Sequence, residues 1–192
     1  MRIPYAPSTP PPNSTPETHA IYQRIATRRA PRPLIPLDLA LLHNPSIADG
    51  YNTLLSALRT STLLPQSLAE LAICYIAVLN FATYEWTAHA PLALKAGVRR
   101  EVLQAVLREE IQSGALSAEE RIVCEYTRES TVGVKVSEET FSKVKELFGE
   151  REVLELVMVV AGYNMVSRLL VGLDVTESNG KEMVMPAEED KP

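Results

Sequence analysis

The sequence has 192 residues, which is enough for one domain or two small ones. Its hydrophobic fraction of 46% and charged fraction of 22% are ordinary for a soluble globular protein, and its net charge of −5 excludes sequence-independent nucleic-acid binding, which needs a basic face. No run reaches the roughly 18–20 apolar residues that span a bilayer, so membrane partners are not expected.

The first 36 residues predict a proline-rich arm. They hold nine of the fourteen prolines, and this density favours an extended, polyproline-like conformation for residues 4–16. A short helix from Glu17 to about Arg28, capped by Thr15 or Thr18, is expected to follow. It ends before the next prolines of the arm.

Cellular location is predicted from the N-terminus and the cysteines. The N-terminus has prolines and hydroxyl side chains where a secretory signal would have an apolar region, so a cytoplasmic protein is expected. Cys74 and Cys124 are each isolated in an apolar helical context. This pattern is typical of buried, reduced thiols and not of a disulfide framework.

The rest of the chain predicts a single all-α domain over residues 37–176. No segment shows the sustained two-residue alternation of a strand. An acidic, flexible tail is expected over residues 177–192. The helices are expected at residues 44–59, 65–97, 98–113, 117–130, 137–149 and 152–170.

The stretch from Pro65 to Gly97 carries most of the unusual residues. It contains the only tryptophan, Trp86, and two carboxylates, Glu70 and Glu85, inside otherwise apolar sequence. Apolar helices rarely carry ionisable groups without a partner or a function. These residues are therefore the first candidates for a functional site.

Three side chains of this stretch form a candidate proton-transfer site. Glu85 and His89 are four residues apart, which places them on one helical face within reach of a hydrogen bond. Glu70 precedes His89 by nineteen residues, about 28 Å along one straight helix. The chain must therefore turn back, and Asn80 and Thr83 are suited to end one helix and cap the next. Glu70 would then meet the other two within one subunit or across an interface.

The charge states of these carboxylates are left open by the sequence. Exposed N–H groups at a helix start favour an anion at Glu85, whereas a nearby Glu70 raises the pKa of one of the two carboxyls. Each candidate residue of this stretch also has an alternative, purely structural role. Ser67 and Glu70 match a capping box, Glu85 and His89 match a surface pair, and Trp86 matches a core residue.

The last helix is apolar on nearly every face, which indicates central burial or burial against another subunit. Homo-oligomerisation is therefore expected. Asn164 and Arg168 lie four apart on this helix, and they match either a site or a brace between helices. A lone arginine on an apolar helix normally pairs with a carboxylate, for which Glu70 or Glu85 is available.

Two motifs resemble the carboxymuconolactone decarboxylase-like family, which shares its helical fold with alkyl hydroperoxidase D-like proteins. The first motif is AELAICYIAVLNFATYEWTAHAPLALKAGV and the second is LVMVVAGYNMVSRLL, and together the resemblance covers about residues 40–175. It implies an oligomeric all-α helical bundle, as a trimer or hexamer, while the sequence by itself predicts only an oligomer, which includes a dimer. It also implies a small-molecule substrate and no cofactor.

The chain departs from the peroxidase branch of this resemblance. That branch has a Cys-x-x-Cys pair followed four residues later by His, with a Glu twelve residues before the first Cys. Carried onto this sequence, the cysteine positions are Ala82 and Glu85, the His is His89 and the Glu is Glu70. The proton-relay residues are present and both thiols are absent, so a dithiol peroxidase is not expected.

The decarboxylase branch is what the resemblance then favours. It implies a lyase or related isomerase acting on a small carboxylated lactone, aromatic or polyketide-like metabolite. Losing CO₂ beside a carbonyl leaves an enolate, which needs a proton donor. His89, Glu85 and Glu70 are the catalytic candidates, and the substrate-binding candidates are Trp86, Tyr84, Tyr163, Asn164 and Arg168.

Three other functions remain open at this point. A non-catalytic binding or scaffold protein would keep the fold without the chemistry. A residual peroxidase would need a thiol borrowed from Cys74 or Cys124. One His and two Glu side chains could also ligate a divalent ion, although no metal site is predicted.

Overall fold

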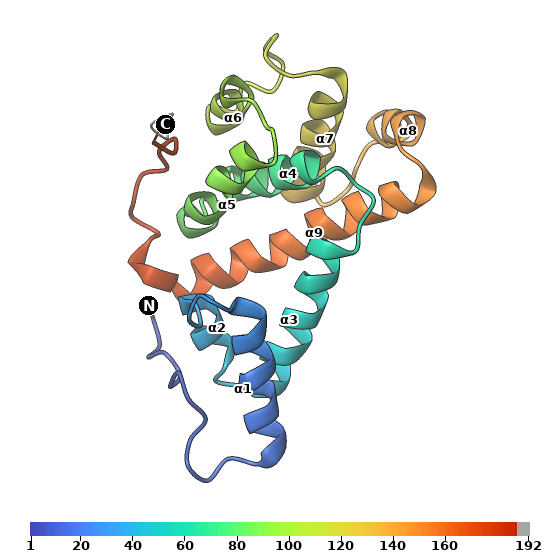
Figure 1. The fold of residues 1–192 in the computed structure, drawn as a ribbon. Coiled ribbons are helices and arrows are strands. Elements are labelled where there is room, and N and C mark those ends of the chain that lie inside the picture. The colour runs from blue at the N-terminus through green and yellow to red at the C-terminus, as the bar shows by residue number, and fades with distance from the viewer. Residues whose placement is uncertain (188–192) are drawn as a thin grey trace. The chain divides into compact units, whose positions relative to one another are not determined.

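The computed structural model describes residues 1–187, and within them every regular element is a helix (Figure 1). The predicted all-α class is confirmed. The elements in chain order are α1 (Pro16–Arg29), α2 (Pro36–Leu41), α3 (Pro45–Thr60), α4 (Gln66–Leu79), α5 (Thr83–Lys95), α6 (Arg100–Leu107), α7 (Ala118–Arg128), the π-helical turn η1 (Glu129–Gly133), α8 (Glu138–Leu147), α9 (Glu150–Leu173) and the 3₁₀ turn η2 (Val175–Glu177).

The chain forms two compact units. Unit 1 contains Met1–Ser61 and Leu173–Glu177, and unit 2 contains Thr62–Gly172 and the described residues from Ser178 onward. The sequence placed the boundary between arm and domain after residue 36, whereas the first unit extends to Ser61 because α1 and α2 pack on α3. Every candidate site residue lies in unit 2.

The helix starts in unit 1 follow the capping residues in the sequence. Thr15 caps α1 by accepting a hydrogen bond from the Thr18 amide at 3.2 Å. Asn44 caps α3 in the same way through the Ile47 amide at 3.2 Å. Each cap satisfies an amide that has no partner inside its helix, and a proline follows each cap at the first helical position.

Unit 2 is built around α4, which contacts α5, α6 and α7. Ten of the fourteen residues of α4 are buried, because nearly all of them are apolar. Leu71 and Tyr75 from α4 and Trp86 from α5 are among the largest fully buried side chains of the protein. The α4–α5 pair thus forms the hairpin on which the candidate site rests.

The turn between α4 and α5 lies where the sequence predicted it, with a different cap. Asn80 ends α4, and the Phe81 and Ala82 amides donate back to the carbonyls of Val78 and Ala77 at 3.1 and 2.8 Å. This is the Schellman pattern, which needs a left-handed residue after the cap. Phe81 occupies that position with a φ of 56°. Ala82, and not Thr83, is the N-cap residue of α5.

Phe81→Gly is expected to stabilise unit 2. A non-glycine residue in the left-handed region carries a cost of about 1–2 kcal/mol, part of which glycine loses again through chain entropy. The side chain of Phe81 is 76% exposed, so little packing is lost with it. We expect a gain of about 0.5–1 kcal/mol in the free energy of unfolding, measured by chemical denaturation. Phe81→Ala keeps the backbone strain, and an equal gain in that control would contradict the explanation.

The C-terminal half of unit 2 follows its predicted caps, with shorter helices. Ser117 and Glu120 form a capping box at the start of α7. Ser137 caps α8 through the Thr140 amide at 3.2 Å. The helix predicted to end at residue 113 ends at Leu107, because Glu109 adopts a left-handed φ of 57°.

The long helix α9 has the length and apolar composition to cross a membrane. Half of its most apolar window is buried inside the structure. Partial burial of this kind is expected of the core helix of a soluble protein, and the structure is compatible with one.

The predicted tail differs from the structure in its described part. Residues 178–187 contain no helix, yet they contact α5 and α6 through hydrogen bonds of Thr83, Trp86 and Arg100. No local sequence pattern predicts these contacts, because their acceptors are main-chain carbonyls. Residues 188–192 of the predicted tail lie outside the described part of the chain.

Candidate active site

The α4–α5 hairpin brings Glu70 and His89 together. The Nδ1 atom of His89 lies 2.7 Å from Oε2 of Glu70, and both side chains are buried. An ionised carboxylate has no hydrogen to donate, so Nδ1–H is the donor and Nε2 is left as the second functional atom of the ring. Glu70 therefore has a partner across the hairpin and does not act as the cap of α4, whose N-cap is Pro65.

The other face of the imidazole is covered by α9. The ring of Tyr163 meets the ring of His89 edge to face, with centroids 5.1 Å apart and planes at 85°. Such a contact fixes the plane of the imidazole in addition to the hydrogen bond that Nδ1 donates to Glu70. His89 is still 8% exposed, so the ring is not sealed from solvent.

Glu85 has a different partner from the one predicted. Its Oε2 accepts a hydrogen bond of 2.9 Å from Ser167 Oγ on α9, and its Oε1 is buried without a hydrogen-bond partner among residues 1–187. The hydrogen bond that the four-residue spacing allowed between Glu85 and His89 is not formed. The two side chains share one face of α5, and each contacts a different turn of α9, at Ser167 and at Tyr163.

Burial decides the charge of Glu85. Desolvation raises its pKa well above the ordinary value, and the hydrogen bond from Ser167 opposes this only in part. The position of Glu85 in the first turn of its helix, which favours an anion, is outweighed. This shift favours the neutral carboxylic acid form of Glu85, one turn from the Glu70–His89 pair.

Asn164 forms a brace between three segments. Its Nδ2 donates to Thr131 Oγ1 at 2.9 Å, and its Oδ1 accepts from Asn80 Nδ2 at 3.0 Å. Arg168 donates to the same Oδ1 at 2.7 Å, where the sequence had predicted a carboxylate partner for it. Asn164 thus connects helices, as the brace alternative proposed. The side chain of Arg168 lies beside it and is exposed.

The two aromatic candidates on α5 lie in different surroundings. Trp86 is 1% exposed within the hydrophobic core, and its Nε1 donates to the carbonyl of Val184 at 2.8 Å. Tyr84 is half-buried in the first turn of the helix. Trp86 thus occupies the core position that the sequence left open as an alternative to substrate binding.

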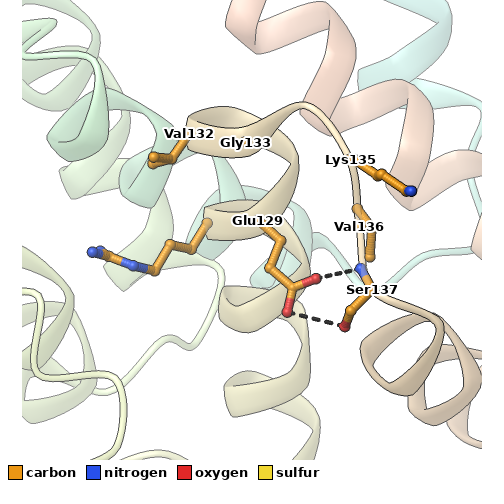
Figure 2. A pocket seen from close by; sticks show the side chains of 7 residues that line it. Glu129, Val132, Gly133, Lys135, Val136 and Ser137 are labelled. Carbon is orange, nitrogen blue, oxygen red and sulfur yellow. Dashed lines mark hydrogen bonds between the residues drawn. The ribbon is translucent and has the colours of Figure 1, made fainter.

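A surface groove lies in another part of unit 2, beside the π-helical turn (Figure 2). Its carboxylate, Glu129, accepts hydrogen bonds from the Ser137 amide at 2.6 Å and Thr140 Oγ1 at 2.7 Å. The Ser137 amide lowers the pKa of Glu129, which serves as a cap for α8. No predicted site residue lines this groove of about 520 Å³, which is formed by Arg128, Glu129, Val132, Gly133, Lys135, Val136 and Ser137.

Residues 45–123 match the model of the carboxymuconolactone decarboxylase family. This span contains both helices of the hairpin and the Glu70–His89 pair. The predicted resemblance to the carboxymuconolactone decarboxylase family is confirmed. No curated protein matches the sequence.

Solved structures show the same fold at low sequence identity. A peroxidase-related protein from Ralstonia eutropha JMP134, described as an alkylhydroperoxidase AhpD core, has a TM-score of 0.75 and 16% identity over 91% of this chain and 90% of its own. A peroxidase-related protein from Silicibacter sp. TM1040 has a TM-score of 0.71 and 15% identity over 92% and 95%. The debrominase Bmp8 in complex with 2,3,4-tribromopyrrole has a TM-score of 0.64 and 19% identity over 88% and 89%.

The two thiols of the chain are not placed for redox chemistry. Cys74 and Cys124 are free and fully buried, and burial raises the pKa of both. A raised pKa suppresses the thiolate, which is the reactive form. The two positions that the resemblance assigns to a thiol pair hold Ala82 and Glu85.

The candidate site residues do not form a metal-binding cluster in the described part of the chain. Within residues 1–187, no group of three or more His, Cys, Asp and Glu side chains is arranged to hold an ion. The three predicted residues divide instead into a Glu70–His89 pair and a Glu85–Ser167 pair.

Sequence reasoning missed Ser167 and Thr131 as partners. Ser167 interrupts an apolar helix four residues after Tyr163, and a buried hydroxyl in such a helix requires an acceptor. That signal was available in the sequence. Thr131 had none, because its role depends on the π-helical turn that brings it to Asn164.

Proposed function

We propose that the protein is a cofactor-free acid–base enzyme, a decarboxylase or related isomerase acting on a small carboxylated lactone, aromatic or polyketide-like metabolite. The observation that carries this proposal is the buried Glu70–His89 hydrogen bond of 2.7 Å. A carboxylate that holds Nδ1–H fixes the tautomer and the orientation of the ring. Nε2 is then the atom that exchanges a proton with the substrate.

In the decarboxylation direction, the bond between the substrate carbon and its carboxylate breaks, and its electron pair moves into the neighbouring carbonyl. CO₂ leaves, and an enolate remains. Nε2 of His89 takes up a proton from solvent, and Glu70 stabilises the imidazolium so formed. Nε2 then delivers that proton to the carbon, which returns the ring to its neutral form with the proton on Nδ1. In an isomerisation, Nε2 removes a proton from one substrate carbon and returns it to another carbon of the same substrate.

Glu85 is proposed to favour substrate binding because its neutral form does not repel an anion. The substrate class proposed here is anionic, and an ionised carboxylate one turn from His89 would repel it. Burial raises the pKa of Glu85 and so favours its neutral form, and Glu70 is the carboxyl group that contacts the imidazole. Ser167 is a positioning residue for this acid.

Arg168 is the proposed anchor for the substrate carboxylate. Among residues 1–187 it uses only Nη1 for hydrogen bonds, to Asn164, and a guanidinium has five N–H donors. The planar guanidinium group can bind a carboxylate through two parallel hydrogen bonds. Tyr163, Asn164 and Tyr84 are proposed as further substrate-binding residues. Trp86 is also proposed to contribute to substrate binding, because it lies on α5 in the turn before His89.

The comparisons support this choice among acid–base reactions. The matching family is described as carboxymuconolactone decarboxylases, and Bmp8 is described as a debrominase in complex with a small brominated pyrrole. The buried thiols count against peroxide reduction, as do the missing cysteines at positions 82 and 85.

The proposal is tested by a substrate panel in metal-chelated buffer without added cofactor. Small lactones, β-keto acids and aromatic acids with a carboxylate beside a carbonyl are incubated with the protein in D₂O. CO₂ release or deuterium incorporation at carbon is the expected result for at least one class. Turnover that appears only after a metal or redox cofactor is added would contradict the proposal.

Self-association and a cytoplasmic location remain parts of the proposal. Exposed apolar side chains in unit 2, among them Phe81, Val132 and Met165, support an interface. We expect light scattering to give a dimer, trimer or hexamer of the 21.2 kDa chain. A mass that stays at one chain up to high micromolar concentration would contradict it.

A further inference from the structure

The described end of the chain is held on unit 2 by three side chains. Thr83 Oγ1 and Trp86 Nε1 on α5 donate to the carbonyls of Lys181 and Val184 at 3.0 and 2.8 Å. Arg100 on α6 donates to the carbonyl of Pro186 at 2.6 Å. All three contacts are made to the main chain, so this surface of α5 and α6 recognises an irregular backbone segment through its carbonyl groups.

Side chains of the segment add a hydrogen bond from Asn179 Nδ2 to the carbonyl of Val171 at 2.8 Å and the contacts of two methionines. Met183 and Met185 are partly buried against the core, and Val184 between them is 64% exposed. Methionine is unbranched and adapts to irregular surfaces, so its contacts can be made and lost without repacking the core. The segment thus has few buried apolar contacts, which is typical of regions that open locally.

The residues before the segment are strained. Asp174, Thr176 and Glu177 have φ values of 52°, 59° and 50°, which glycine adopts readily and other residues rarely. Strain persists only where surrounding contacts enforce it. The contacts that hold these residues are those of the Thr176 amide to Tyr5 Oη and of Glu177 to the Met1 amine, so this junction is anchored independently of the segment that follows it.

We propose that residues 178–187 are a reversible latch on a surface of α5 and α6 that binds extended main chain. In the closed state the latch covers the indole N–H of Trp86. In the open state the core and the Glu70–His89 pair persist, and the three donors face solvent. The inference is independent of the proposed reaction, because it concerns only contacts of the latch.

Trp86 is a specific reporter, because it is the only tryptophan in the chain. Its indole N–H gives one resolvable NMR signal, whose exchange with solvent requires the latch to open. The test variant is T83A/R100A, which removes two of the three donors and leaves Trp86 in place. The matched control is T87A/R99A, whose side chains contact Thr83 O, Glu101, Ala115 and Glu120 and not the latch.

The latch predicts that indole exchange in T83A/R100A is at least about tenfold faster than in wild type, with an unchanged rate in the control and an unchanged circular dichroism spectrum in both. Acrylamide quenching of Trp86 fluorescence should rise in parallel. Equal exchange and quenching in the test variant and wild type would overturn the proposal. If T83A/R100A does not fold, Arg100→Ala against Arg99→Ala decides in the same way, because both arginines lie near the surface.

Discussion

The His89→Gln variant is expected to turn over substrate about 10²–10⁴-fold more slowly than the wild type, since a positioned acid–base group contributes a factor of this size. Glutamine can still hydrogen-bond Glu70 and cannot exchange a proton. The loss should therefore fall on kcat more than on KM. Steady-state kinetics on the substrate identified in the panel measure it, and an intact melting transition shows that the fold is kept.

His19→Gln is the matched control, because His19 is exposed on α1 in unit 1. Glu70→Gln is the companion variant. Its amide can donate to Nδ1 and so place the ring proton on Nε2, which inverts the tautomer while keeping the shape. A loss of about 10²-fold or more is expected from that inversion. Full activity of both His89→Gln and Glu70→Gln would contradict the proposed mechanism.

The second large effect is on stability, and it concerns Glu85. Its ordinary pKa is 4.5 and burial raises it well above that value in the folded protein. Above pH 4.5 the unfolded chain releases this proton and the folded chain keeps it, so the unfolded state binds fewer protons. The contribution of Glu85 to stability is thus fully present below pH 4.5 and is lost as pH rises towards the raised pKa, by up to about 1.4 kcal/mol per pH unit.

Glu85→Gln should remove this dependence, because an amide has nearly the shape of the neutral acid and does not ionise. We expect the variant to exceed the wild type at pH 7 by about 1–3 kcal/mol in the free energy of unfolding, with the difference vanishing near pH 4.5. Urea denaturation at several pH values measures it. The exposed Glu138→Gln on α8 is the control. A variant less stable than wild type at pH 7 and 8 would show that Glu85 is ionised in the fold.

The hairpin and the Glu70–His89 contact were predictable because they follow from two strong local signals. Polar residues in an apolar run need partners, and Asn80 followed by a helix start marks a reversal. Distance alone then excluded a single helix. The same kind of reasoning predicted the caps at Asn44, Ser117 and Ser137, since each cap acts within three residues of its own position.

The neutral state of Glu85 was not predictable, because it depends on how completely α9 covers α5. Spacing allowed a Glu85–His89 bond, and packing replaced it with Ser167. The core position of Trp86 was not predictable for a related reason. Its indole N–H is satisfied by Val184, nearly a hundred residues later, and no local pattern announces a bond to a main-chain carbonyl. The division at Ser61 likewise depends on packing of α1 and α2 on α3.

The central claim is that Glu70 fixes His89 with its proton on Nδ1 and leaves Nε2 to act on the substrate. Nitrogen-15 NMR of histidine-labelled protein, at a pH where neutral imidazole dominates, tests it most directly. The chain has three histidines, and the His89→Gln variant assigns the relevant pair of signals. We predict a protonated-type shift for Nδ1 and an unprotonated-type shift for Nε2 of His89. The reverse assignment, with the proton on Nε2, would contradict the account.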